Sequence, residues 1–352
     1  MHKHELIFRS LFQAIQDGKF RPGARLPSES MLARKHRVSR PTAAQALREL
    51  QRLELIERRP GSGTFVRAAK ADARGSLALV SDGLGRTEIL EPITTEIGRA
   101  AQARGWSLTV AVHAMEESPD TLIRGWVERG IAGVFFAPVE HHPIRAAINR
   151  AFAERVIQHR LRLVLLDRDL AEYPERSGFD VVGIDDFLAG VHLGAHLFDG
   201  GRRKIAFVAR TAYPPSTDLR FAGVREAAHR VAGASVSWNI GDPGDVKWIA
   251  SVLSRSRCDA VVCSNDATAA ELLQSLRALK RRVPEDVALA GFDDVKYAMR
   301  LVPPLTTMRQ PCAQLAEAAV EAMMSRMEHP GLPARRILVE APLVVRASTG
   351  GA

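Results

Sequence analysis

Residues 26–66 read LPSESMLARKHRVSRPTAAQALRELQRLELIERRPGSGTFV, and this stretch decides the fold of the N-terminal part of the chain. Ser28 is a typical helix N-cap, and Glu29 after it places a negative charge in the first turn, where the helix dipole favours it. Ser39 offers a second N-cap, and Pro41 falls in the following first turn, where a missing N–H costs little. The stretch therefore predicts two short helices separated by a tight turn.

The second predicted helix has one apolar and one polar face. Its apolar residues recur at helical spacing and predict a buried stripe made of Ala43, Ala46, Leu47, Leu50 and Leu53. Residues 55–58 and 64–66 then have the character of two strands around a Pro-Gly-Ser-Gly tip. Helix, turn, helix and hairpin are typical of a winged helix-turn-helix, whose second helix enters the major groove of DNA. A small helical domain used only for packing is the alternative.

The positive charge of the chain is concentrated in this segment. Residues 1–74 hold 16 Lys and Arg against 7 Asp and Glu, an excess of nine, and the net charge of all 352 residues is also +9. The rest of the chain is therefore neutral. A basic module joined to a neutral body indicates binding to nucleic acid through phosphate contacts. Residues 5–16 precede the stretch and are predicted to form a helix that buries Leu6, Ile7, Leu11, Phe12 and Ile15.

The motifs of the segment resemble those of the GntR family of winged-helix regulators. The matching residues are Pro22-Gly23, Leu26-Pro27-Ser28-Glu29, Leu32-Ala33, Val38-Ser39-Arg40, Thr42, Ala46-Leu47, Leu50, Leu55-Ile56 and Gly61-Ser62-Gly63-Thr64-Phe65-Val66. Two arginines that are frequent DNA contacts in that family are replaced here by Ser30 and Ala44, and Glu54 replaces a usual glycine. The operator is therefore not expected to have the family's usual sequence.

The resemblance and the polar face of the second helix together nominate the DNA contacts. Glycines at the wing tip would let the backbone approach a phosphate closely. The expected contacts are Ser28, Arg34, Ser39, Arg40, Thr42, Gln45, Arg48, Gly61, Ser62 and Gly63.

From residue 76 the pattern changes to apolar runs that alternate with helical segments. Such runs predict parallel strands covered on both faces, which is the α/β class. The predicted strands are 77–80, 107–112, 132–136, 163–166, 181–184, 205–208, 260–263 and 287–290. These are too many for one sheet, so we expect two Rossmann-like lobes, with a ligand outside the carboxyl ends of the strands.

Motifs for catalysis and for cofactors are missing from the sequence. No predicted strand is followed by G-x-G-x-x-G, and there is neither a P-loop nor a G-x-S-x-G elbow. His192 and His196 have the spacing of a metal-binding pair but no third ligand, and the three cysteines are expected to be reduced. We therefore predict no enzyme activity, no cofactor and no metal. No apolar run is long enough to span a membrane, and the cytoplasm is the expected location.

The second half carries motifs that resemble the effector domain of LacI/GalR-type repressors, which is similar to periplasmic sugar-binding proteins. The motifs are HLFDGGRRKIAF at 196–207, RFAG at 220–223, DAVVCSNDATA at 259–269, VPEDVALAGFDD at 283–294, PLTTMRQ at 304–310 and RAST at 346–349. Gly201 is a departure, because the family usually has histidine there. The resemblance implies two lobes joined by three crossovers, near Asp180, Arg309 and Val339.

The expected organisation follows from both resemblances. Residues 1–67 form the winged helix-turn-helix, 68–76 the linker, and 77–349 an effector-binding and dimerisation domain. Within the latter, lobe 1 is expected to hold about 77–180 and 310–338, and lobe 2 about 181–309 and 339–349.

The effector would lie in the cleft between the lobes. Arg220 offers a planar fork of donors for vicinal hydroxyls, Asp293 accepts hydrogen bonds, and Asn265 can do both. Asp266 is expected to cap its helix and Asp294 to be structural. The full set of candidate effector contacts is Asp82, Asp167, Arg220, Trp238, Asn265, Asp293 and Gln310.

These observations predict a one-component transcription regulator, a repressor of carbohydrate-utilisation genes, which is similar to the arabinose-responsive branch of the GntR family. It is expected to be a homodimer that binds a pseudo-palindromic, double-stranded operator and responds to a sugar-like effector. Two alternatives stay open: a small-molecule sensor without a direct role in transcription, and a regulator with a nucleobase or sugar-phosphate effector.

Overall fold

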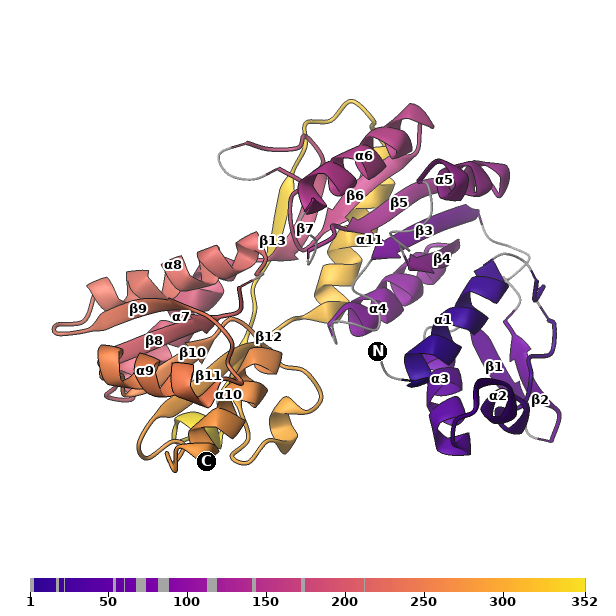
Figure 1. Ribbon diagram of the computed structural model, residues 1–352. Helices are drawn as coiled ribbons and strands as arrows, with labels where there is room; N and C mark the ends of the chain where they lie inside the picture. The colour runs from indigo at the N-terminus through magenta and orange to yellow at the C-terminus, as the bar shows by residue number, and fades with distance from the viewer. Residues whose placement is uncertain are drawn as a thin grey trace.

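The computed structural model describes residues 3–16, 19–21, 23–52, 55–59, 61–67, 74–81, 89–112, 119–140, 144–171, 175–211 and 213–351. Most of the expected linker, together with Leu53, Glu54 and Asp82, lies outside these residues. Figure 1 shows a small N-terminal domain at the lower right and two α/β lobes, one above it and one to the left.

The N-terminal domain consists of α1 (Lys3–Gln16), α2 (Glu29–His36), α3 (Arg40–Arg52) and the antiparallel hairpin of β1 (Ile56–Arg59) and β2 (Gly63–Val66). Both predicted N-caps are formed, because the Ser28 hydroxyl accepts from Met31 N and the Ser39 hydroxyl from Thr42 N, each at 3.3 Å. The predicted stripe of α3 is fully buried at every described position, namely Ala43, Ala46, Leu47 and Leu50. The predicted N-cap and the predicted buried face of α3 are thus both present in the structure.

One prediction for α1 was wrong. Leu6 is 47% exposed, whereas Phe8 is buried and stacks on Phe12. Residues four positions apart lie on the same side of a helix, so the pairs Ile7–Leu11 and Phe8–Phe12 define the buried face and leave Leu6 outside it.

Lobe 1 contains a six-stranded, wholly parallel sheet in the order β13-β7-β6-β5-β3-β4. Helices α4 and α11 cover one face of the sheet and α5 and α6 the other (Figure 1). Trp126 of α5 and Phe152 of α6 are large side chains buried against this face of the sheet. The elements are β3 (Gly75–Ser81), α4 (Leu90–Ala103), β4 (Trp106–Val112), α5 (Pro119–Glu128), β5 (Ile131–Ala137), α6 (Arg145–Gln158), β6 (Arg162–Leu166), β7 (Asp180–Ile184), α11 (Cys312–Glu328) and β13 (Arg336–Val339).

Lobe 2 contains a second six-stranded sheet, in the order β14-β12-β11-β10-β8-β9, in which only β14 runs antiparallel to its neighbour. Its elements are α7 (Asp186–Asp199), β8 (Lys204–Ala209), α8 (Pro215–His229), β9 (Ser235–Ile240), α9 (Val246–Ser256), β10 (Ala260–Cys263), α10 (Asp266–Ala278), β11 (Ala288–Asp293), η1 (Ala298–Arg300), β12 (Thr306–Arg309), β14 (Leu343–Val344) and η2 (Ala347–Thr349). The strands β9, β12, β13 and β14 were not predicted. Each has partly exposed positions or is very short, so none forms a long apolar run.

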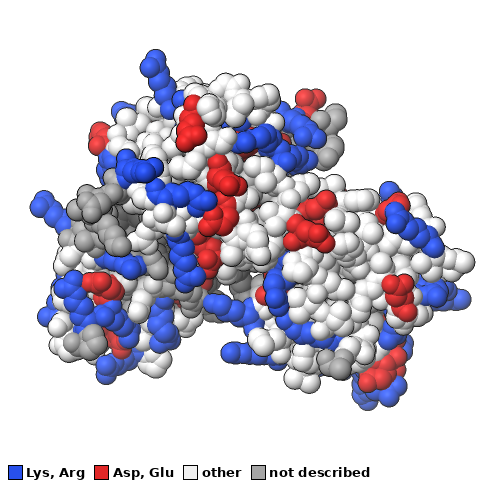
Figure 2. All heavy atoms as spheres, turned by 180° about the vertical axis from the view of Figure 1, so that it is seen from behind, with Lys and Arg blue, Asp and Glu red and all other residues white. Residues whose placement is uncertain are grey.

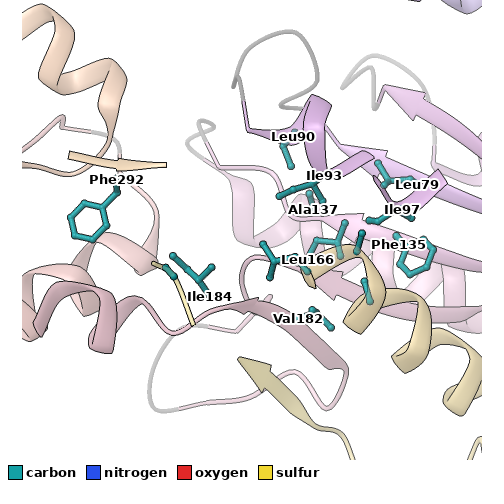
Figure 3. Close-up of a cluster of buried hydrophobic side chains, with 14 of the residues drawn as sticks. Leu79, Leu90, Ile93, Ile97, Phe135, Ala137, Leu166, Val182, Ile184 and Phe292 are labelled. Carbon is teal, nitrogen blue, oxygen red and sulfur yellow. The ribbon is translucent and has the colours of Figure 1, made fainter. Parts of the chain in front are cut away.

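The chain passes between the lobes three times: after β7, after β12 and after β13. The first passage lies later than expected, because β7 belongs to the sheet of lobe 1 and residues 181–184 were assigned to lobe 2. Strand β7 lies between β6 and β13, and all of its residues are buried, so lobe 1 extends to Ile184. Figure 3 shows a cluster of buried apolar side chains at this boundary. The cluster extends from Ile97 and Phe135 in lobe 1 to Ile184 at the crossover, and it also includes Phe292 of lobe 2.

Glycines bring α7 and α8 into close contact. A Cβ on Gly190 would collide with the backbone carbonyl of Arg220, and a Cβ on Gly223 with that of Phe187. This close approach places Arg220 on α8 against the N-terminus of α7, where Asp186 lies.

Candidate functional site

The N-terminal end of α3 presents polar side chains to solvent. Arg40 is 71% exposed, and Gln45 and Arg48 are exposed on the same helix. Thr42 is half-buried, and its hydroxyl lies 2.7 Å from that of Ser39. Figure 2 shows Lys and Arg side chains gathered over the N-terminal domain, at the lower left of that view. These features suit the end of a helix that meets a polyanion.

Glu29 connects this helix to the hairpin. Its carboxylate accepts from Arg40 Nε at 3.3 Å and from Arg58 Nη2 at 2.6 Å. Partial burial opposes ionisation of Glu29, but the hydrogen bonds from Arg58 and Arg40 outweigh it and hold the pKa of Glu29 below its usual value. Arg58 lies on β1 before the wing tip and was not among the predicted DNA contacts, although its basic side chain lies near the glycine-rich turn.

The other predicted DNA contacts lie in different surroundings. Gly61 and Ser62 are exposed at the wing tip, and Gly61 has a φ of 72° that favours glycine. Gly63 is half-buried, with a φ of 117°, and a Cβ there would lie 2.8 Å from Arg25 Nε. Arg34 is exposed near the end of α2, whereas the Ser28 hydroxyl is already engaged as a cap.

Arg220 is the centre of the second group of candidates. Its side chain is only 6% exposed. Nε donates to Asp186 Oδ1 at 2.7 Å, Nη1 donates to the carbonyl of Ser264 at 2.8 Å, and Nη2 lies 3.7 Å from Asp293 Oδ1. The guanidinium also lies over the Phe292 ring, 4.8 Å from its centroid. Burial opposes its charge, but the carboxylates of Asp186 and Asp293 outweigh burial and raise the pKa of Arg220.

Asp293 and Gln310 meet at the second passage between the lobes. Gln310 Nε2 donates to Asp293 Oδ1 at 3.3 Å, and Gln310 N donates to the Asp293 carbonyl at 3.2 Å. Asp293 ends β11 with a φ of 106°, an unusual conformation for a residue with a side chain. The geometry holds its carboxylate between Gln310 and Arg220.

Lobe 1 contributes Asp167 and Arg168, at the end of β6. Asp167 has a φ of 70°, and its backbone N donates to the Val182 carbonyl at 2.7 Å. Arg168 pairs with Asp167 at 3.1 Å and with Glu140 at 2.8 Å, while its buried Nε has no hydrogen-bond partner among the described residues. Burial opposes the charge of Arg168, but Asp167 and Glu140 raise its pKa, and the nearby Arg220 opposes them. Two guanidiniums, one from each lobe, thus lie close together among carboxylates.

Arg168, Asp186 and Glu140 were not among the sequence-based candidates. Arg168 directly follows Asp167 after a predicted strand, so its position was a usable signal. Asp186 directly follows the cap residue Asp185, whose side chain accepts from Leu188 N at 2.9 Å, and nothing in the local sequence indicates that it meets a residue 34 positions away.

The cap of α10 is a different residue from the one expected. Asn265 is the N-cap of α10, because its Oδ1 accepts from Thr268 N at 2.9 Å. Asp266, which was expected to cap, is fully buried and accepts from Thr307 Oγ1 at 2.7 Å and from Val295 N at 3.0 Å. Asp294 is held by Arg309 and Arg346, each at 2.6 Å, consistent with a structural role.

Trp238 is not brought together with the other candidates. It packs in an aromatic cluster, with ring centroids 5.3 Å from Phe207, 4.5 Å from Phe221 and 5.4 Å from Tyr213. Its strand, β9, is the edge of the sheet and is separated from β11 by β8 and β10. Asp82 lies outside the described residues, so the group brought together consists of Asp167, Arg220, Asp293 and Gln310, with Asn265 next to Ser264.

A pH dependence follows from Asp186. Burial raises the pKa of Asp186 to about 7 against the opposing Arg220, with Asp167 and Asp293 adding to the rise. Between pH 3.8 and about 7 the native state holds a proton that the unfolded state has lost. The stabilisation from this proton is therefore complete below pH 3.8, decreases steadily over the interval and is gone above about pH 7.

We expect Asp186→Asn, which keeps an oxygen acceptor for Arg220, to remove this dependence. The unfolding free energy of the natural protein minus that of the variant should fall by up to about 3 kcal/mol between pH 4.5 and pH 7. Urea denaturation between pH 4.5 and 8 measures it, with Asp199→Asn, exposed at the other end of α7, as the control. A difference that stays constant over this range would contradict the assignment.

Comparisons with known proteins match both parts of the chain. Residues 3–66 match the family described as bacterial regulatory proteins, gntR family, and residues 195–349 match the periplasmic binding protein-like domain. An arabinose metabolism transcriptional repressor of Geobacillus stearothermophilus is 25% identical over 99% of this chain and 97% of its own length. A ribose operon repressor of Escherichia coli K12 is 26% identical over 76% of this chain and 81% of its own.

A solved structure supports the fold over most of the length. The transcriptional regulator CelR–cellobiose complex superimposes with a TM-score of 0.65 and 23% identity, covering 92% of this chain and 100% of that one. Within the part of the chain that the structure describes, no helix is long and apolar enough to cross a membrane.

Proposed function

Because the chain joins a GntR-family DNA-binding domain to a periplasmic binding protein-like domain, we propose that it is a transcriptional repressor of carbohydrate-utilisation genes. A sugar in the interlobe cleft would set its affinity for the operator. The observation that carries the proposal is the buried group of Arg220, Asp293 and Gln310, whose charged members interact electrostatically with Asp167 and Arg168 of the other lobe. Relatives that span most of the chain are named as arabinose and ribose repressors, which agrees with a sugar effector.

The charges of the cleft favour a neutral effector. Arg168 and Arg220 already contact four carboxylates: Glu140 and Asp167 at the first, Asp186 and Asp293 at the second. Arg145, which lies beside Glu140 and Arg168, is not free either. A phosphate would require cations that are free to pair with it. A sugar instead needs donors and acceptors in alternation, which the Arg220 fork, the Asp293 carboxylate and the Gln310 amide offer. We therefore favour a free sugar over a sugar phosphate.

Coupling to DNA would act through the relation between the lobes. A sugar that contacts both Arg168 of lobe 1 and Arg220 of lobe 2 binds one lobe arrangement better than the other and shifts the population towards it. Since lobe 1 follows the winged helix in the chain, the shift would change the spacing of two recognition helices in a dimer.

The active form is proposed to be a homodimer in the cytoplasm, where the operator DNA lies. Met299 and Val302 are 62% and 71% exposed in the segment between β11 and β12, and they offer an apolar contact for a second copy. A symmetric dimer would recognise a pseudo-palindromic operator.

The test is fluorescence anisotropy with labelled DNA from the region upstream of the protein's own gene, at several salt concentrations, with and without sugars. We expect Arg40→Ala and Arg48→Ala each to weaken binding about tenfold or more, and the slope of log affinity against log salt to fall by about one for each lost phosphate contact. Arg99→Ala, which removes an exposed arginine of α4 in lobe 1, is the matched control. A chain that binds sugar but no such DNA would instead be a sensor without a direct role in transcription.

A further inference from the structure

Lobe 1 has a row of arginines at the end of its sheet that lies opposite the cleft. The cleft lies at the carboxyl ends of the parallel strands, where Asp167 follows β6. At the amino ends, an arginine stands one or two positions before each of four neighbouring strands. This arginine row consists of Arg74 before β3, Arg104 before β4, Arg129 before β5 and Arg160 before β6.

The register of the sheet places the four positions side by side. The first pairs of β3 with β4 and with β5 involve Gly75 and Ser76, so these three strands begin within one residue of each other. Strand β6 begins at Arg162, opposite Gly133 near the start of β5. The strands are adjacent in the order β6-β5-β3-β4, and neighbouring strands lie about 4.8 Å apart. The row therefore spans roughly 14 Å.

Two members of the row can meet an anion without breaking an existing ion pair. Arg74 and Arg160 are exposed, and neither has an ion pair among the described residues. Arg104 is held by Glu317 at 2.8 Å, and Arg129 also has a partner. The free positive charge thus lies at Arg74 and Arg160, and the other two arginines reinforce it.

Helix dipoles account for part of this pattern. Arg104, Arg129 and Arg160 follow the ends of α4, α5 and α6 within two residues, where a helix dipole stabilises a cation. In lobe 2, Lys280 follows the end of α10 in the same way. Arg74 does not end one of these helices, so the dipole does not explain it. What distinguishes the row of lobe 1 from the cations of lobe 2 is its place in the chain.

The chain enters lobe 1 from the DNA-binding domain at this row. The hairpin ends at Val66 and β3 begins at Gly75, so the two points lie no more than about 32 Å apart, whatever path the chain takes. Arg74 N donates to the Gly105 carbonyl at 2.6 Å, which fixes the entry point beside β4. Figure 1 shows the N-terminal domain beside lobe 1. A duplex bound by α3 extends beyond that domain in both directions.

We propose that the arginine row of lobe 1 is a second DNA contact, which binds the phosphate backbone of the duplex without reading its sequence. The proposal rests on the DNA-binding function above. Phosphates of one strand recur every 3.4 Å along the duplex axis, so a row of about 14 Å faces several of them. Such contacts add affinity and position the protein, but they carry no sequence information directly.

Removing two charges tests the proposal. Arg74→Gln with Arg160→Gln keeps long polar side chains and removes both free cations. The matched control is Lys280→Gln with Arg281→Gln, two exposed cations at the corresponding end of lobe 2. Fluorescence anisotropy of the full chain would use the upstream DNA and a random-sequence duplex of equal length.

We expect the steepness of log affinity against log salt to fall by almost two for the variant of Arg74 and Arg160, because each lost phosphate contact removes about 0.9. The advantage of the natural protein over this variant should shrink about tenfold between 50 and 200 mM salt. Both duplexes should show the same change, and the lobe 2 control should show none.

Phosphate ethylation interference then locates the contact. Some phosphates whose ethylation weakens binding of the natural protein should have no effect on the variant of Arg74 and Arg160, and they should differ from those lost in Arg48→Ala. An unchanged salt dependence would refute the row, and so would an equal fall in the lobe 2 control. Upstream DNA that binds no better than the random-sequence duplex would overturn the operator-binding part of the proposed function. The salt dependence on the random-sequence duplex would still decide whether the row contacts DNA.

Discussion

Replacing Arg220 with alanine should abolish effector binding and lower the free energy of unfolding by about 3–5 kcal/mol. The side chain is buried and bonds Asp186, the Ser264 carbonyl and the Phe292 ring face. Its removal leaves the carboxyl groups of Asp186 and Asp293 without their shared cation, so the pKa of each rises further, and two buried polar groups without a partner cost more than the lost contacts alone. Urea denaturation and calorimetric titration with the identified sugar measure the two effects.

Two further variants separate stability from recognition. Arg225→Ala removes an exposed arginine of the same helix and should change either quantity little. The double variant Arg220→Met with Asp186→Asn removes both charges of the pair, so it should regain part of the stability while binding no sugar. An Arg220→Ala protein that keeps its affinity for sugar would show that the effector does not lie against this guanidinium.

The fold of the N-terminal domain could be predicted because its signals are local. Ser28 and Ser39 cap helices within three residues, and the apolar spacing of α3 defines its buried face directly. The parallel strands of the lobes could also be predicted where both faces of the strand are covered, as in β5 and β11. The edge strand β9 was not, because its positions are only partly buried and its sequence is mixed.

The site was less predictable because it depends on contacts between distant residues. Asn265 and Asp266 both have side chains that can cap a helix, and the sequence alone does not choose between them. The structure chooses through the backbone, since Asn265 is extended at φ −158° while Asp266 is drawn towards Thr307, 41 positions later. Trp238 likewise has the chemistry of a sugar-stacking residue, but three aromatic neighbours from elsewhere in lobe 2 occupy its surroundings.

The same dependence on distant partners sets the lobe boundary. The sequence suggested a passage near Asp180, yet that residue begins the last lobe 1 strand before the first crossover. Asp180 is completely buried and binds two arginines that follow it by 146 and 155 positions. The family resemblance placed the first passage near this residue, but its charge is neutralised inside lobe 1.

Asp180→Ala should therefore lower the free energy of unfolding by about 3 kcal/mol. The carboxylate accepts from Arg326 Nη2 at 2.8 Å, from Arg335 Nη2 at 3.1 Å and from Arg335 N at 2.7 Å. It thus joins the start of β7 to the end of α11 and to the segment before β13. The side chain of Arg326 is 13% exposed and that of Arg335 is 38% exposed, so solvent screens the Arg335–Asp180 pair more. We therefore expect a loss at the lower end of the roughly 3–5 kcal/mol that breaking a buried ion pair costs.

The effect of Asp180 should also depend on pH in the opposite sense to that of Asp186. Burial opposes ionisation, but the hydrogen bonds from Arg335 and Arg326 outweigh it and hold the pKa of Asp180 below its usual 3.8. Its stabilisation is then complete above that value and is lost as pH falls through the lower native pKa. Urea denaturation at pH 7 and below pH 4 measures the loss of stability and its pH dependence. The control is Glu226→Ala on α8, which breaks the exposed pair with Arg230 and is expected to cost under about 1 kcal/mol. Equal losses for the two variants at pH 7 would mean that the buried cluster does not hold the crossover strands together.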